Sequence, residues 1–158
     1  VKSKSKTMAA SKGRYYPYSY ENYDFSEPDY TLTELNIANK NLAILPDDLK
    51  YYTMLEHLIC DCNHLEYINK TDLPASIKIL DCSFNAFRHL DNLPLHIEEL
   101  YCCNNKLTRL GNLPLILQGL DISNNNIDVS KINFINVNPN IIIYYSKKVG
   151  TIPHKGFS

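Results

Sequence analysis

The chain of 158 residues contains no tryptophan and five glycines, and it has no apolar run long enough to span a bilayer. Lysine and serine follow Val1, so the start of the sequence lacks the apolar stretch of a signal peptide. We therefore expect no membrane association. We expect a protein kept in the cytosol or nucleus, with the cytoplasm as the predicted location.

Motifs for catalysis and cofactor binding are also missing. There is no glycine-rich phosphate loop, no Cys-x-x-Cys pair and no serine or cysteine within a nucleophile motif. The five histidines fall on unrelated positions, and His57 with Asp61 is expected to be a solvated surface pair. The sequence predicts a protein that is not an enzyme and that has no cofactor, metal ion or small-molecule substrate.

A repeated pattern is the most informative feature that is present. Apolar residues recur at fixed positions around an asparagine, and successive units start 22, 20 and 20 residues apart. The four units are Leu55-x-x-Leu58-x-Cys60-x-x-Asn63-x-Leu65, Ile77-x-x-Leu80-x-Cys82-x-x-Asn85-x-Phe87, Ile97-x-x-Leu100-x-Cys102-x-x-Asn105-x-Leu107 and Leu117-x-x-Leu120-x-Ile122-x-x-Asn125-x-Ile127. The spacing resembles the leucine-rich repeat at the short end of its length range, which implies a solenoid of stacked repeats.

Within each unit, alternating apolar and polar residues predict a short strand, and stacked units predict a parallel sheet. The asparagine that follows each strand can satisfy buried backbone groups that have no partner in the sheet. A Leu-Pro pair before most units, such as Leu73-Pro74, favours a non-helical outer layer. The predicted fold class is an α/β repeat solenoid, a horseshoe with short parallel strands on its concave face, extended or 3-10 segments on its convex face and few regular helices.

The pattern over residues 32–127 is similar to the short, proline-containing leucine-rich repeats of bacterial effector proteins. This resemblance implies the same architecture and a habit of binding proteins. No ubiquitin-ligase domain of the kind found in that family follows the repeats in this sequence. The resemblance therefore carries an expectation of binding and none of catalysis.

The sequence predicts one domain with two extensions. Residues 23–146 form the repeat domain, with about five repeats and a closing strand over 138–146, while residues 1–22 and 147–158 form basic extensions. The first repeat is atypical, as terminal repeats usually are, because Lys40 stands at its asparagine position. Three aromatic residues before it are expected to cover the open end of the core: Tyr23, Phe25 and Tyr30.

An odd number of cysteines, five, is typical of a protein in a reducing compartment. Cys60, Cys82 and Cys102 occupy the same inward position of three repeats, so we expect them to pack in the core rather than to bind zinc. Cys62 and Cys103 fall on positions predicted to face outward. These two are candidate reactive thiols.

Charge is distributed unevenly along the chain. Residues 1–14 contain five basic side chains and no acid, whereas residues 31–146 contain eight basic and thirteen acidic ones. The outward strand positions combine carboxylates with apolar and aromatic groups, which suits a basic protein segment and disfavours phosphate. The predicted protein-binding residues of this concave face are Glu34, His57, Ile59, Asp61, Ile79, Asp81, Phe84, Glu99, Tyr101 and Asp121.

The N-terminal extension has a different composition. Its lysines alternate with small residues, and a tyrosine-rich run over 15–20 follows. Basic groups neutralise phosphates and aromatic rings stack on unpaired bases, so this composition is typical of RNA-binding extensions. A solvated tail whose tyrosines pack on the solenoid is equally compatible with it. The predicted RNA contacts are Lys2, Lys4, Lys6, Lys12, Arg14, Tyr15, Tyr16, Tyr18, the rim residues Arg88, Lys106 and Arg109, and Lys147 and Lys148.

Two functions therefore remain open at the level of sequence. The first is a non-catalytic structural component, anchored through its basic termini to ribosomal or other structural RNA in a large assembly, with a protein neighbour at the concave face. The alternative is a soluble adaptor or effector that captures a protein on its acidic, aromatic concave face. Deletion of residues 1–14 separates the two hypotheses, because only the first requires that segment for association with the assembly.

Overall fold

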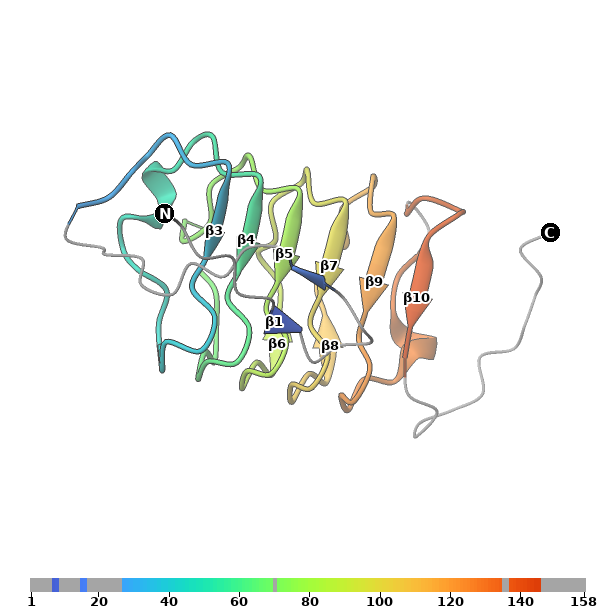
Figure 1. Ribbon diagram of the computed structural model, residues 1–158. Coiled ribbons are helices and arrows are strands. Elements are labelled where there is room, and N and C mark those ends of the chain that lie inside the picture. Colours follow the sequence, from blue (N-terminus) through green and yellow to red (C-terminus); the bar gives the residue numbers. More distant parts are fainter. Residues whose placement is uncertain (1–6, 9–14, 17–26, 70, 135–136, 146–158) are drawn as a thin grey trace.

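The computed structural model describes residues 7–8, 15–16, 27–69, 71–134 and 137–145. Each repeat contributes one short strand to a six-stranded parallel sheet, and the strands lie side by side in chain order (Figure 1). The strands are β3 (Glu34–Asn36), β4 (His57–Ile59), β5 (Ile79–Asp81), β7 (Glu99–Tyr101), β9 (Gly119–Asp121) and β10 (Ile142–Tyr144). The predicted leucine-rich-repeat solenoid is confirmed.

The strands pair in the register that the repeats predict. Leu58 lies opposite Leu80, and Leu80 lies opposite Leu100 in the next strand. At the C-terminal end, Ile143 pairs with Leu120, so β10 forms the closing strand expected over 138–146. A shift of one residue would turn every leucine outward, and the hydrophobic core therefore holds the register.

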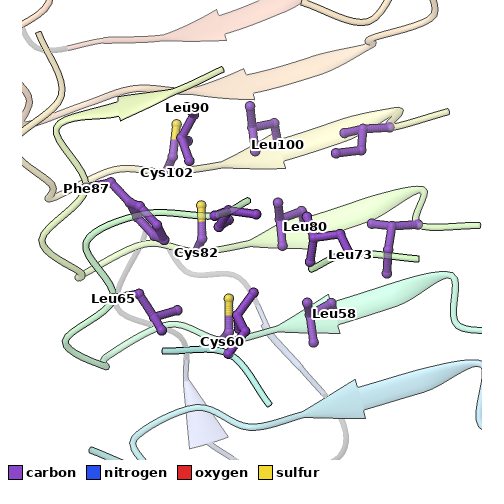
Figure 2. Packing of buried hydrophobic residues seen from close by; sticks show 14 of the residues in the cluster. Leu58, Cys60, Leu65, Leu73, Leu80, Cys82, Phe87, Leu90, Leu100 and Cys102 are labelled. Atoms are coloured by element: carbon purple, nitrogen blue, oxygen red, sulfur yellow. The ribbon is translucent and has the colours of Figure 1, made fainter. Parts of the chain in front are cut away.

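The core lies between the sheet and the outer segments. Leu58, Leu80 and Leu100 are fully buried, and the inward cysteines form a second column beside them (Figure 2). The packing role predicted for Cys60, Cys82 and Cys102 is confirmed, because all three are fully buried. Burial raises the pKa of each of these thiols well above its usual range.

The outer layer is mostly extended, as the Leu-Pro pairs predict. It includes two 3-10 helices, η1 (Leu49–Tyr51) and η2 (Val129–Lys131), and a small parallel pair, β6 (His89–Leu90) with β8 (Arg109–Leu110). The described residues contain no α-helix. Near the N-terminus, β1 (Thr7–Met8) and β2 (Tyr15–Tyr16) form a separate antiparallel pair.

The asparagines form a hydrogen-bonding ladder along the solenoid. Asn105 Nδ2 donates to the carbonyl oxygens of Cys82 at 3.1 Å, Cys102 at 3.2 Å and Cys103 at 3.3 Å. Its Oδ1 accepts from the backbone N–H of Phe87 at 3.0 Å. Equivalent contacts are made by Asn63, Asn85 and Asn125. The predicted structural role of this column is confirmed.

The N-terminal end of the core is closed by aromatic rings. The Tyr30 ring meets the ring of Tyr52 edge-on at 4.9 Å between centroids, and Tyr52 is fully buried. Tyr30 itself remains 42% exposed, so it covers Tyr52 from outside. Tyr23 and Phe25, the other expected cap residues, lie outside the described residues.

Candidate functional site

The strand register builds the outer face of the sheet from three columns of side chains that point away from the core. We call these columns together the concave face. The first contains Glu34, His57, Ile79, Glu99, Gly119 and Ile142, the second Asn36, Ile59, Asp81, Tyr101, Asp121 and Tyr144, and the third Ala38, Asp61, Ser83, Cys103 and Ser123. Among the described residues of the three columns, His57 is the one basic side chain.

Two carboxylates of the second column also have a local structural role. Asp81 Oδ1 accepts a hydrogen bond from the backbone N–H of Ser83 at 3.0 Å, and Asp121 Oδ1 accepts one from Ser123 at 3.0 Å. These bonds satisfy the backbone where the chain leaves the strand. An asparagine in place of either aspartate would keep this acceptor and remove the negative charge, which makes the two functions separable.

The central residues of the face are less accessible than we expected from the sequence. Asp81 is 1% exposed, Asp121 3% and Tyr101 5%, and Ile59 is also buried. The register prediction is therefore right, but the expectation of an open acidic and aromatic surface is wrong for these four residues. The residues of the first column, such as Glu34, are partly exposed.

Asp61, in the third column, is a buried carboxylate that is affected by the charge of Asp81. Burial and the negative charge of Asp81 raise the pKa of Asp61 to about 6. The thiol of Cys62 donates to Asp61 Oδ2 at 3.3 Å, and partial burial of that thiol, together with the Asp61 charge, raises the pKa of Cys62 to about 12. A thiol that is fully protonated at neutral pH is a poor nucleophile, which disfavours a reactive role for Cys62, although its outward position agrees with the prediction.

The third column contains a second cysteine and two buried hydroxyls. Cys103 was expected to be exposed but is only 2% exposed, and burial raises the pKa of its thiol. The oxygens of Ser83 and Ser123 are buried without a hydrogen-bond partner among the described residues. Cys103 lies close enough to Ser83 to affect the thiol, but no hydrogen bond of normal geometry joins them. Unsatisfied buried hydroxyls are unusual in a native fold.

At the first and second columns, the Tyr101 hydroxyl donates to the Glu99 carboxylate. This pair holds an aromatic ring and an acid together on neighbouring outward positions of β7. Phe84 lies shortly after the end of β5, is partly buried and has a positive φ of 51°. The equivalent residues Asn104 and Asn124 adopt the same conformation, so this φ belongs to the turn of each repeat.

The rim residues predicted to bind RNA lie on the outer layer. Arg109 donates to both carboxylate oxygens of Asp91, at 3.1 and 2.8 Å, and His89 Nδ1 lies 3.0 Å from the same carboxylate. The guanidinium of Arg109 is therefore already paired with the carboxylate of Asp91. Arg88 and Lys106 are exposed.

The remaining predicted RNA contacts are not placed with the site. Tyr15 and Tyr16 form β2. The other residues of that prediction lie outside the part of the chain that the structure describes: Lys2, Lys4, Lys6, Lys12, Arg14, Tyr18, Lys147 and Lys148. RNA binding thus stays a prediction.

Sequence analysis missed a row of polar residues one position before the strands. Lys78 Nζ donates to Glu56 Oε1 at 2.6 Å, and Gln118 Nε2 donates to Glu98 Oε2 at 3.2 Å. These residues border the concave face at its first column. Their regular position before each strand is the signal that could have revealed them, because equivalent positions of adjacent repeats lie side by side.

Metal-binding clusters and membrane-spanning helices are absent from the described residues. Within the described ranges no group of three or more histidine, cysteine or acidic side chains could hold a metal ion. No helix in the described part of the chain is long and apolar enough to cross a bilayer. A hollow lined by Ile44, Lys50, Tyr67 and Asp72 lies in the loops after β3 and β4, away from the concave face.

Comparison with solved structures finds leucine-rich-repeat proteins of the same fold. The leucine-rich-repeat domain of a Shigella effector superposes with a TM-score of 0.61 at 27% identity, over 72% of this chain and 48% of that one. YopM from Yersinia enterocolitica gives a TM-score of 0.61 at 27% identity, over 72% of this chain and 24% of YopM. No protein-family model and no curated protein matches the sequence.

The chain thus spans about half the length of the first of these structures and a quarter of the second. In this chain, the described residues form a parallel-strand solenoid with short repeats and no α-helix. The protein is a leucine-rich-repeat solenoid, similar in fold to the leucine-rich-repeat domains of bacterial effectors.

Proposed function

We propose that this protein is a non-catalytic binding module whose concave face captures a basic segment of a partner protein. The observation that carries the proposal is the concentration of carboxylates on one face of one sheet, from Glu34 through Asp81 to Asp121. Complementary charge steers a basic partner to the face and suppresses acidic competitors.

The apolar members of the face support the same function. Ile59 and Ile79 lie beside the acids, and Tyr101 adds an aromatic ring at the middle of the sheet. Aromatic residues are enriched where proteins bind each other, and a mixture of rings and acids suits lysine and arginine side chains, whose stems are apolar. The adaptor hypothesis is therefore favoured over anchoring to structural RNA, for which the acidic face provides no support.

A reducing compartment such as the cytoplasm fits this proposal. All five cysteines are free, and three of them are buried in the core. Free thiols are typical of proteins that are kept reduced.

The test is a binding titration with a fluorescent peptide rich in lysine, arginine and tyrosine. We expect the double variant Asp81→Asn, Asp121→Asn to bind it at least about tenfold more weakly, because two charges are lost while the local hydrogen bonds to Ser83 and Ser123 are kept. The matched control is Asp47→Asn with Asp72→Asn, which removes two carboxylates away from the face. Equal affinities of both double variants would refute the proposal.

A further inference from the structure

The burial of the concave face requires a cover. Asp81 and Asp121 point away from the core, on the face of the sheet that the outer segments do not cover. Both side chains are nevertheless almost inaccessible to water. The hydroxyl of Ser123, which has no hydrogen-bond partner within the described ranges, and the thiol of Cys103 are buried on the same face. Side chains on one uncovered face of a sheet would be in contact with solvent.

The described chain points to its own N-terminal region as this cover. Strands β1 and β2 pair with each other and with no strand of the six-stranded sheet, so they extend neither of its edges. In the view of Figure 1 this pair overlaps the sheet around β5 and β7. These are the strands that contain Asp81 and Tyr101.

Charge and length fit the same occupant. Residues 1–14 contain five basic side chains and no acid, and the three columns of the face contain five carboxylates among the described residues: Glu34, Asp61, Asp81, Glu99 and Asp121. Fourteen extended residues reach about 45 Å, while six strands spaced about 4.8 Å apart span about 24 Å. The segment is therefore long enough to cross the whole face once.

We propose that residues 1–22 of this chain occupy the concave face of their own solenoid, so that a partner's basic segment must displace them. This inference rests on the proposed function, because it names the regulation of the same face. A tethered segment acts at an effective concentration on the order of millimolar. If its intrinsic dissociation constant is about 10 μM, it fills the face about 99% of the time and weakens apparent partner affinity about 100-fold.

The native cysteines provide the test. Cys103 lies under the proposed cover, Cys62 is exposed, and Cys82 and Cys102 report opening of the core. Each thiol of the full chain is labelled with a maleimide, and its rate is followed by mass spectrometry of peptides. The test variant reverses the charges of the segment: Lys2→Glu, Lys4→Glu, Lys6→Glu, Lys12→Glu and Arg14→Glu. The matched control reverses the basic residues of the other terminus: Lys147→Glu, Lys148→Glu and Lys155→Glu.

We expect the test variant to label Cys103 at least about tenfold faster than the native chain and the control, with Cys82 and Cys102 still protected. If the test variant exposes the core thiols as well, the native chain at high salt replaces it, because screening should release the segment and speed Cys103 alone. An unchanged rate at Cys103 in the folded variant, or at high salt in the native chain, would overturn the inference.

The peptide titration separates this inference from the proposed function. If the maleimide labels Cys103 faster in the test variant but that variant binds no basic peptide, the cover exists and the proposed function fails. If the peptide binds through Asp81 and Asp121 but Cys103 is labelled at the same rate in the native chain and the test variant, the face binds proteins and the inference fails. If both hold, the test variant binds the peptide more tightly than the native chain does.

Discussion

Asn105 Nδ2 donates to the carbonyl oxygen of Cys82 at 3.1 Å, so a side chain of one repeat completes the backbone hydrogen bonding of the repeat before it. The same amide group also satisfies two carbonyls of its own repeat, and its oxygen accepts from Phe87. One residue therefore joins two layers of the solenoid.

Replacement of Asn105 by alanine should be strongly destabilising. It would leave the N–H of Phe87 buried without this partner, and it would remove one of the two asparagine donors from the carbonyls of Cys82 and Cys102, which keep Asn85 and Asn125. We expect the free energy of unfolding, measured by urea titration, to fall by about 1–3 kcal/mol, the cost of one unsatisfied buried group. The exposed Asn92→Ala is the control, and a similar loss in both variants would contradict the ladder as the cause.

The two glycines near the middle of the chain should respond differently to alanine. A Cβ at Gly111 would lie 2.6 Å from the Cα of Asp91, whereas a Cβ at Gly119 would meet Tyr101 Oη at 3.7 Å and Glu99 Cγ at 3.8 Å. We expect Gly111→Ala to lower the unfolding free energy by about 1–3 kcal/mol, because β6 and β8 must move apart. Gly119→Ala should change it by less than about 0.5 kcal/mol. Thermal unfolding of the two variants in parallel checks this, and equal losses would count against the close approach at Asp91.

Cys62 offers a stabilising substitution. Its φ is 55°, and Asn39, Asn104 and Asn124 adopt φ of 54°, 53° and 55° at the same position of other repeats. Asparagine tolerates this left-handed conformation better than cysteine does. We expect Cys62→Asn to raise the unfolding free energy by about 0.5–1 kcal/mol, measured by urea titration under reducing conditions. Glu66→Asn, an exposed substitution nearby, should have no effect, and an unchanged stability of Cys62→Asn would argue against strain at this position.

Asp61 should make stability depend on pH in a defined window. Its pKa is about 6 in the fold against an ordinary 3.8, so the folded chain binds this proton more tightly than the unfolded chain. The contribution of this group to stability is therefore fully present below about pH 4 and is lost as the pH rises to about 6. We expect Asp61→Asn to be more stable than the native chain by about 1–3 kcal/mol at pH 7 and by little at pH 4.

The measurement for Asp61 is the difference in unfolding free energy between variant and native chain across this pH range. Other carboxylates add slopes of their own, and these cancel in the difference. Asn92→Ala, an exposed substitution that removes no titratable group, should give a difference that is flat with pH. A flat profile for Asp61→Asn as well would show that the buried charge of Asp61 does not lower the unfolding free energy of the native chain.

The architecture was predictable because every repeat has the same pattern of apolar and polar residues and therefore the same local interactions. The alternation of Leu58 and Cys60 defines an inward strand face, and the position of Asn63 after it follows from the need to satisfy a turning backbone. Equal spacing then places Leu58, Leu80 and Leu100 in one column. These inferences need only local sequence and the rule that repeats stack.

The state of the concave face was not predictable in the same way. The outward direction of Asp81 follows from the period of a strand, but its burial depends on a cover that no repeat pattern describes. The pairing of Arg109 with Asp91 also joins two repeats through long side chains on the rim, where spacing alone does not select partners. The positive φ of Phe84 was hidden because the asparagines at positions 104 and 124 mark that position and phenylalanine does not.

The inward cysteine column makes oxidation a hazard of folding rather than of the folded protein. In the stacked solenoid Cys60, Cys82 and Cys102 are sealed from solvent and protonated. In the unfolded chain the same thiols have ordinary reactivity, and a disulfide formed there would lock neighbouring repeats before they can stack. Withdrawal of reductant should therefore leave the mature protein intact and reduce the yield of chains that are still assembling.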